Sequence, residues 1–227
     1  MVNRPRTPLD RRRVVDAAID YIDRHGVVDL TMRRLGATLN VEAMALYRHI
    51  PGRDQLLDAV VKQVIDDLFD DPRLKDDARS WEEYIYRIAN AIREMAISHP
   101  KLFPLIATRP PDAPWIRPPL RSMRWIENFL SSLKQHGFSD AAAVTAYKAF
   151  TSFILGALLL EAASRGGDLA EIVPMSESSG AERAESYPHV ERLQSLLAED
   201  HNEREFEDGL EELIERLRPL LTSENSY

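Results

Sequence analysis

Cysteine is missing from the 227-residue sequence. Its absence excludes disulfide bonds, thiol nucleophiles and cysteine-ligated metal sites, and it favours a reducing compartment. Long apolar runs are missing as well, because the longest, residues 153–160, is far shorter than the roughly 18 residues that a membrane-spanning helix requires. The N-terminus is basic but no apolar segment follows it, so we expect no secretory signal. Together these absences predict a cytoplasmic protein without a membrane partner.

The signatures of common enzyme classes are also absent. The six histidines show neither HxxxH nor HExxH spacing, and the sequence has no GxSxG motif, P-loop or dinucleotide-binding glycine pattern. The acidic clusters at residues 66–71 and 76–77 lack the glycine and the terminal glutamate of a calcium-binding loop. We therefore expect no catalytic residue, no bound metal and no cofactor, and keep an all-α enzyme only as a remote alternative.

Positive charge is scarce in the chain as a whole but abundant at its start. The formal net charge is −8, yet residues 1–53 hold ten arginines and only six acidic residues. The first segment is therefore basic and the remainder strongly acidic. This asymmetry indicates that only the first segment meets a polyanion such as nucleic acid, the alternative being a solvated charged face.

Strand-like alternation is missing too, and apolar residues recur at helical spacing along most of the chain. The predicted fold class is all-α, with a three-helix head (residues 1–53) and a larger helical body (residues 54–227). Thr7 and Thr31 are the expected N-terminal caps of the first two helices, and Asn40 suits a left-handed turn after the second. The expected head helices span residues 8–25, 32–39 and 42–49.

The body is expected to be helical throughout, apart from two segments. Five prolines interrupt residues 108–119, and residues 164–186 are rich in glycine, serine and glutamate, which predicts a mobile loop. The expected body helices span residues 55–69, 81–98, 101–107, 120–135, 139–163, 189–198 and 204–220.

The second and third head helices have the length and separation of a helix-turn-helix, whose second helix enters the DNA major groove. Arg48 has the reach to form two hydrogen bonds with guanine, and Tyr47 and His49 beside it are donors suited to phosphate oxygens. Arg53 is expected to form a further phosphate contact. The predicted DNA-binding residues are Thr31, Arg33, Ala43, Met44, Ala45, Tyr47, Arg48, His49 and Arg53.

A resemblance to a known family covers residues 11–60, which read RRRVVDAAIDYIDRHGVVDLTMRRLGATLNVEAMALYRHIPGRDQLLDAV. This stretch is similar to the N-terminal DNA-binding domain of the TetR family of bacterial transcriptional regulators, most specifically in LTMRRL, LYRH and LLDAV. Looser similarity to the tetracycline-repressor branch of that family continues in TRP, HGFS and ILGALLLE, at residues 108–110, 136–139 and 154–161.

The resemblance implies a repressor that binds palindromic double-stranded operator DNA as a homodimer, paired through residues 139–163 and 204–220. It also implies a cavity in the body for a hydrophobic small-molecule effector, which releases the DNA through movement of the helix at residues 55–69. The cavity lining that it implies is mostly apolar and aromatic with a few hydroxyls, and comprises Tyr84, Ile88, Phe103, Ile106, Thr108, Ile126, Phe129, Val144, Tyr147 and Thr151.

Three positions depart from the family pattern. Gly36 stands where alanine is usual and is expected to loosen its helix by about 0.5–1 kcal/mol relative to alanine. Asn40 replaces the usual glycine of the turn. Leu105 stands at the position of the tetracycline repressors' metal-binding histidine, so we expect neither magnesium nor tetracycline to bind. A body that binds a protein partner instead of a small ligand remains the alternative.

Overall fold

The computed structural model describes residues 8–74, 78–109, 122–167 and 187–222. Within these ranges the chain folds into helices and contains no β-strand. The predicted all-α class is therefore confirmed. Most of the predicted loop at 164–186 lies outside the described residues, as do the prolines between residues 110 and 119.

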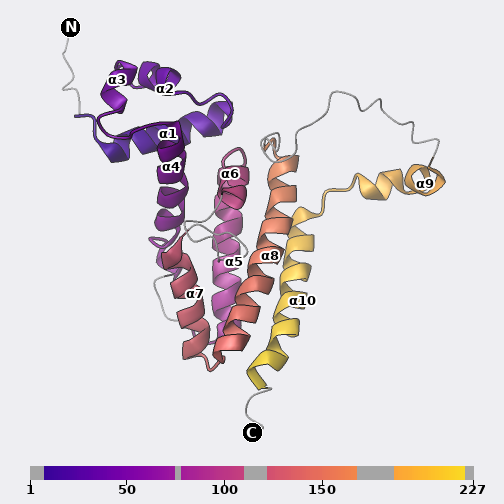
Figure 1. Cartoon of the computed structure of the whole chain (residues 1–227). Helices are drawn as coiled ribbons and strands as arrows, with labels where there is room; N and C mark the ends of the chain where they lie inside the picture. The colour runs from indigo at the N-terminus through magenta and orange to yellow at the C-terminus, as the bar shows by residue number, and fades with distance from the viewer. Residues whose placement is uncertain (1–7, 75–77, 110–121, 168–186, 223–227) are drawn as a thin grey trace.

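A three-helix head lies at one end of the molecule (Figure 1). Val14, Ala18 and Ile22 are fully buried and recur at helical spacing on the first helix, which packs against α2 and α4. This spacing is the source of the head's core, because it places all three side chains on one face of the helix. The head helices are α1 (Arg11–His25), α2 (Met32–Thr38) and α3 (Ala43–Leu46).

Two head boundaries differ from the prediction. The first helix is capped by Asp10, whose Oδ1 accepts a hydrogen bond from the Arg13 backbone N–H at 2.8 Å, whereas Thr7 lies outside the described residues. The third helix ends at Leu46 instead of residue 49. The chain continues from Leu46 as a turn, in which the His49 and Ile50 N–H groups both donate to the Leu46 carbonyl.

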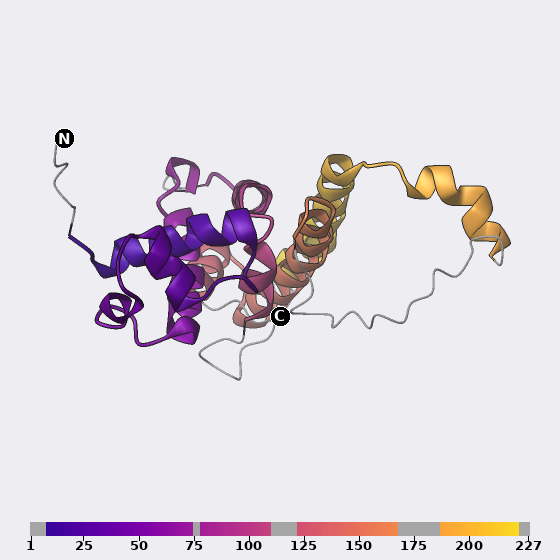
Figure 2. The same ribbon diagram turned by 90° about the horizontal axis from the view of Figure 1, so that it is seen from above.

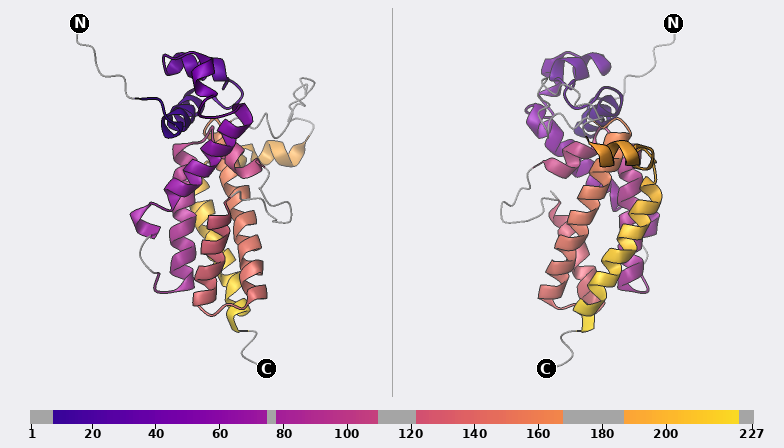
Figure 3. Two further views of the ribbon diagram at one scale, coloured as in Figure 1. Left: turned by 60° about the vertical axis from the view of Figure 1, so that its left-hand side comes forward. Right: turned by 90° about the vertical axis from the view of Figure 1, so that its right-hand side faces the viewer.

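The body is a helical bundle whose first member comes directly from the head. The helix α4 runs out of the head and packs against α5, α7 lies below the end of α4, and α8 and α10 run alongside α5 (Figures 1 and 3). One helix, α9, stands away from this bundle (Figure 2). The elements are α4 (Arg53–Leu68), η1 (Pro72–Leu74), α5 (Trp81–Ser98), α6 (Phe103–Thr108), α7 (Met123–Gln135), α8 (Asp140–Ser164), α9 (Pro188–Leu197) and α10 (Asn202–Thr222).

The central helix of the body is α8, which begins after its predicted cap Ser139. Its length and apolar composition would also suit a membrane span. The helix instead packs against α5, α6, α7 and α10, and a helix enclosed by neighbours on several sides is apolar nearly all round. We therefore attribute its composition to its position in the core.

One buried ion pair ties three body helices together. Glu161 on α8 is only 3% exposed, and its carboxylate accepts hydrogen bonds from Arg93 Nη2 at 2.9 Å and Arg93 Nε at 3.0 Å. Arg165 donates to the same carboxylate, and the Arg93 guanidinium lies over the ring of Phe206 on α10. The charge of Glu161 is thus met by two guanidinium groups, which is what a buried carboxylate requires.

Candidate nucleic-acid interface and body cavity

The turn between α2 and α3 is closed by two features of the backbone. Asn40 has a positive φ of 53°, so the predicted left-handed turn is confirmed. The Val41 N–H donates to the Gly36 carbonyl at 2.9 Å, and a Cβ at residue 36 would lie 2.9 Å from the Val41 oxygen. The prediction that Gly36 only loosens its helix is therefore incomplete. The missing side chain also allows α2 and α3 to approach each other closely.

The residues around α3 divide into anchors and an exposed face. Leu46 and Ile50 are buried in the head core, whereas Met44 is 73% exposed and Tyr47 is 44% exposed. Arg48 is also exposed, and no described residue forms an ion pair with it. Since α3 ends at Leu46, these last two side chains extend from the turn that follows the helix.

The remaining predicted contacts on α2 and α3 surround this face. Ala43, Ala45 and His49 are partly exposed, and Arg33 is fully on the surface. Thr31 caps α2 as predicted, because its Oγ1 accepts from the Arg34 N–H at 3.2 Å. The helices α2 and α3 lie together at the outer end of the head (Figure 1), and the contacts of these side chains with DNA stay a prediction.

Arg53 is placed differently from the prediction of a phosphate contact. Its Nε donates to the Leu30 carbonyl at 2.8 Å, and its Nη2 donates to the Val27 carbonyl at 2.8 Å. Both carbonyls belong to the segment between α1 and α2, so the guanidinium fastens the start of α4 to the head. Arg53 is therefore a structural tie within the head, and its contact with a DNA phosphate stays a prediction. These acceptors could not be expected from sequence patterns, since they lie more than 20 residues away.

Polar contacts between head and body were not predicted from the sequence. His99, the residue after α5, lies with its Nδ1 2.7 Å from Asp23 Oδ2 on α1. Lys101 Nζ donates to the Arg24 carbonyl at 2.8 Å. These two contacts join α1 of the head to the segment after α5. Within the body, Arg109 Nε at the end of α6 donates to Asp58 Oδ1 on α4 at 2.5 Å.

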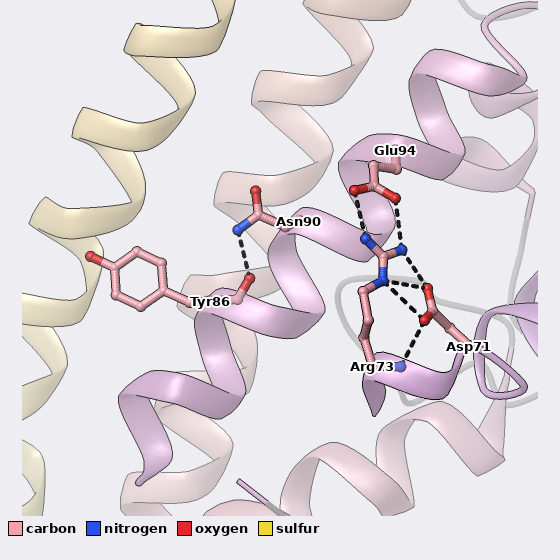
Figure 4. Close-up of polar contacts among 5 residues, drawn as sticks. All are labelled: Asp71, Arg73, Tyr86, Asn90 and Glu94. Carbon is pink, nitrogen blue, oxygen red and sulfur yellow. Dashed lines mark hydrogen bonds and ion pairs between the residues drawn. The ribbon is translucent and has the colours of Figure 1, made fainter. Parts of the chain in front are cut away.

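A cleft of about 440 Å³ opens beside this junction, between α1, α4, η1 and α5. Arg73 lies on its rim and bridges Asp71 and Glu94, with Nη1 2.6 Å from Glu94 Oε1 (Figure 4). Burial raises the pKa of Asp67, another residue of this lining. The cleft is acidic, and Arg73 offsets part of its charge. Asp16 and Asp20 complete its acidic lining.

The predicted body residues gather around a ring cluster rather than a spacious pocket. Phe129 lies at its centre, with ring centroids 5.8 Å from both Tyr84 and Tyr147 and 5.0 Å from Phe150. Burial raises the pKa of Tyr84, whose hydroxyl donates to Asn128 Oδ1 at 3.0 Å. These contacts fill the space between α5, α7 and α8 with side chains.

A small cavity of about 30 Å³ lies next to this cluster, where α4 to α8 meet. Of the predicted lining residues, only Phe103 and Ile106 border it. Trp125 also lines the cavity and was not predicted. It lies one helical turn before the predicted residue Phe129 on α7, so this spacing would have indicated it. The full lining is Ile65, Leu68, Ile92, Met95, Phe103, Ile106, Trp125, Ile154 and Leu155.

The other predicted lining residues are separate from the cavity. Val144 is 41% exposed and does not border this cavity, so its assignment to the lining gains no support here. The Thr108 hydroxyl donates to the Pro104 carbonyl at 2.7 Å within α6. Ile88 is buried and Ile126 is half-buried, both in the surrounding core. No lining residue of the 30 Å³ cavity comes from this group.

The outer face formed by α8 and α10 is apolar in part. Leu160 on α8 is 73% exposed. Phe153 is half-buried and lies over Gly209 on α10, where a Cβ would be 2.7 Å from its ring. Exposed apolar side chains also mark the helix α9, which has no buried residue. They are Tyr187, Val190, Leu193, Leu196 and Leu197.

The chain is similar to proteins of known class. A family model described as the tetracycline-repressor-like C-terminal domain matches residues 72–220. The class A tetracycline repressor of transposon 1721 from Escherichia coli is 30% identical over 178 residues, 75% of this chain and 77% of that protein. A possible TetR family transcriptional regulator from Streptomyces coelicolor A3(2) gives a TM-score of 0.72 at 29% identity, over 93% and 100% of the two chains. The TetR family protein ActR from Streptomyces coelicolor, in complex with actinorhodin, gives 0.68 at 26% identity, over 93% and 96%.

Proposed function

The chain belongs to the TetR family of transcriptional regulators, and we propose that it is a cytoplasmic, ligand-responsive repressor. It binds palindromic operator DNA as a homodimer and leaves the DNA when a hydrophobic small molecule enters its body. The head of residues 1–53 binds the DNA, and the body of residues 54–227 forms the dimer and binds the ligand. No catalytic role is proposed, in keeping with relatives that are regulators.

The observation that carries the DNA-binding proposal is the exposed end of the helix-turn-helix. Leu46 and Ile50 hold α3 in the head core, and the same short segment presents Met44, Tyr47 and Arg48 outward. A guanidinium in this position suits the O6 and N7 acceptors of guanine, and apolar side chains beside it suit thymine methyl groups. The arginine-rich head supplies the general attraction to phosphates.

The homodimer is supported by the outer face of α8 and α10. A leucine that is 73% exposed, Leu160, and the half-buried Phe153 lie on this face. The helix α9 directly before α10 adds further exposed apolar side chains. A second copy covers such surfaces and supplies the two-fold symmetry that matches a palindromic operator.

The effector acts on the cavity where α4 to α8 meet. At about 30 Å³ the cavity is far smaller than the roughly 300 Å³ or more of a typical ligand pocket, so a ligand must displace its walls. Ile65 and Leu68 of α4 are among these walls, and Arg53 ties the other end of α4 to the head. A ligand that favours a displaced α4 therefore shifts the population towards heads that no longer match the operator.

A binding titration tests the proposal. The protein is titrated by fluorescence anisotropy against the DNA upstream of its own gene, with random DNA as competitor and salt varied. We expect saturable binding by a dimer that resists the competitor. Binding no tighter than to random DNA, both there and in a genome-wide selection of bound fragments, would refute the proposal.

A further inference from the structure

An acidic face of α1 lies against an acidic surface of the body. Asp16, Asp20 and Asp23 occupy positions i, i+4 and i+7 of α1, so their side chains project from one side of that helix. The first two line the cleft at the junction of head and body. The acidic lining residues of the same cleft on the body side are Asp67, Asp71 and Glu94. Like charges repel across such a cleft, so positive charge between them favours a closed junction.

Arginines offset part of this negative charge, and they stay charged throughout the physiological pH range. The Arg73 guanidinium donates to Asp71 and Glu94 on the body side (Figure 4). Burial raises the pKa of Asp67, and the charge of Arg12 on α1 opposes this effect in part. These arginines therefore balance the junction without making it sensitive to pH near neutrality.

Two polar contacts join α1 to the segment that follows α5. Lys101 Nζ donates to the Arg24 carbonyl at 2.8 Å, and Arg24 Nη2 lies 3.8 Å from Asp20 Oδ2 on the same helix. A lysine also stays charged near neutral pH. The second contact places His99 Nδ1 2.7 Å from Asp23 Oδ2, and His99 is the only histidine among the cleft's lining residues. Of the two contacts, the His99–Asp23 pair is therefore the one whose charge changes near neutral pH.

The Asp23 carboxylate depends on His99 for a hydrogen bond within the junction. Its Oδ1 is buried and has no hydrogen-bond partner among the described residues, and its Oδ2 meets His99 Nδ1. In a neutral imidazole only one of the two ring nitrogens carries a proton, whereas both carry one in the protonated ring. Protonation therefore ensures that Nδ1 donates, and it adds the attraction of opposite charges to the hydrogen bond.

The pH range of this effect follows from the surroundings of His99. The hydrogen bond to Asp23 raises the pKa of His99, burial partly opposes the rise, and the charge of Asp20 adds to it. Because the folded-state pKa lies above the unfolded value, the contact is fully formed below about pH 6.5. It is lost as the pH rises through the folded-state pKa, and the acidic surfaces then repel each other without it.

We propose that the His99–Asp23 contact is a pH-dependent switch of operator binding. While His99 is protonated, the contact holds α1 on the body; when the proton leaves, repulsion between the two acidic surfaces loosens the head. The switch rests on the proposed operator binding, because a dimer meets two half-sites only if its heads keep a fixed separation. A loosened head must be ordered when it binds DNA, at a cost in conformational entropy. Operator affinity therefore falls as the pH rises.

Thermodynamic linkage provides the first test. A proton that favours operator binding must itself be held more tightly in the operator complex. The pKa of His99 is measured from its imidazole resonances in the full-length protein, free and bound to operator. We expect a higher pKa in the complex and, correspondingly, operator binding about tenfold tighter at about pH 6 than at about pH 8.5. A His99 pKa that is equal or lower in the complex would overturn the switch.

A variant identifies the titrating group. His99→Gln keeps a polar side chain that stays neutral, and it should remove most of the pH dependence of operator affinity measured by anisotropy. His189→Gln is the matched control, because His189 lies on the exposed helix α9, and it should keep that dependence. Titrations on random DNA reveal any contribution from His49, which would act on both DNAs. An unchanged pH dependence in a folded His99→Gln protein contradicts the assignment.

Spin labels test the movement of the head without DNA. The chain has no cysteine, so Ala37→Cys on α2 and Glu127→Cys on α7, both at exposed positions, label one site on the head and one on the body. Labelled protein is diluted with unlabelled protein. We expect a narrow distribution of distances at about pH 6, a broad one at about pH 8.5, and a narrower one again in high salt, which screens the repulsion.

The two measurements separate the switch from the proposed function. A distance distribution that is the same at both pH values overturns the switch, as does a pH-independent operator affinity with a mobile head. Broadening at high pH in a protein that binds no operator refutes the proposed function and leaves the pH-dependent contact of head and body standing.

Discussion

His99 and Asp23 join the body to the head through a hydrogen-bonded pair, with His99 Nδ1 2.7 Å from Asp23 Oδ2. The two residues are 76 positions apart in the chain, and about a quarter to a third of each side chain is exposed. The pair lies beside Lys101, which donates to the Arg24 carbonyl of the same helix. The position of α1 relative to α5 thus depends on a group that titrates near neutral pH.

This pair predicts a pH-dependent part of the stability. The hydrogen bond to Asp23 raises the pKa of His99, an effect that burial partly opposes. A folded-state pKa above the unfolded value means that the stabilisation is complete below about pH 6.5, the ordinary histidine pKa, and is lost as the pH rises through the folded pKa. Asp23→Asn should therefore lower Tm clearly at pH 5.5 and much less at pH 8.5.

Thermal unfolding across this pH range measures the effect. His189→Gln is the control, because His189 lies on the exposed helix α9 and should leave the pH dependence unchanged. An equal loss of Tm at both pH values for Asp23→Asn would show that the charge of His99 contributes nothing.

Arg48→Ala tests base recognition. We expect specific operator binding to weaken by about 1–3 kcal/mol with little change on random DNA, because a bidentate arginine contact specifies one base pair per half-site. Arg34→Ala is the control variant. It removes the same charge from the head, but the Arg34 side chain is bound to Asp29, with Nη1 2.5 Å from Oδ1. Anisotropy titrations of both variants on both DNAs give the comparison. Equal losses on specific and random DNA for Arg48→Ala would contradict its role in reading sequence.

Arg53→Ala is expected to act on the head's stability first. It leaves the Leu30 and Val27 carbonyls without their guanidinium donor, and hydrogen bonds to charged groups are worth about 1.5–3 kcal/mol. Water can replace part of this lost hydrogen-bond energy because the site is only partly buried. We therefore expect the free energy of unfolding, measured in urea, to fall by about 1–2 kcal/mol. A change confined to the salt dependence of DNA binding, with unaltered unfolding, would contradict this structural role and favour the phosphate contact predicted from the sequence.

Glu161→Ala should be strongly destabilising. The substitution leaves the guanidinium of Arg93 without its carboxylate in a site where Glu161 is 3% exposed, and breaking a buried pair in this way costs about 3–5 kcal/mol. Glu212→Ala on α10 provides a control, since that residue is exposed. Urea unfolding of the two variants measures the difference, and similar values would argue against a paired charge at Glu161.

Leu160→Glu should weaken the proposed dimer. The introduced carboxylate would have to be buried against a second copy on the outer face of α8, at a cost of several kcal/mol. Met123→Glu is the matched control, because Met123 is 52% exposed and lies on α7, away from that face. Size-exclusion chromatography with light scattering reports the mass of each variant. An unchanged dimer in Leu160→Glu would place the interface elsewhere.

The head could be predicted closely because its signals are local. The apolar spacing of α1, the Thr31 cap and the Asn40 turn each depend on neighbours within a few residues, and all three are present in the structure. The tie that Arg53 forms within the head could not be predicted for the opposite reason: its acceptors lie in another segment and are backbone atoms, which carry no residue-specific mark in the sequence.

The body cavity could be predicted only in part. Phe103 and Ile106 were expected and do border it, whereas Trp125 was missed and Val144 does not border it. On an apolar helix such as α8, periodicity does not tell which face meets the ring cluster and which meets solvent or a second copy. That choice is made by packing between helices that are distant in the chain.

The close contact at Gly36 makes the helix-turn-helix rigid. No side chain separates α2 from the backbone at Val41, so the two helices cannot move closer together. Arg53 also joins α4 to the loop that precedes α2 through two hydrogen bonds. We therefore expect a tilt of α4 to move Arg48 with it.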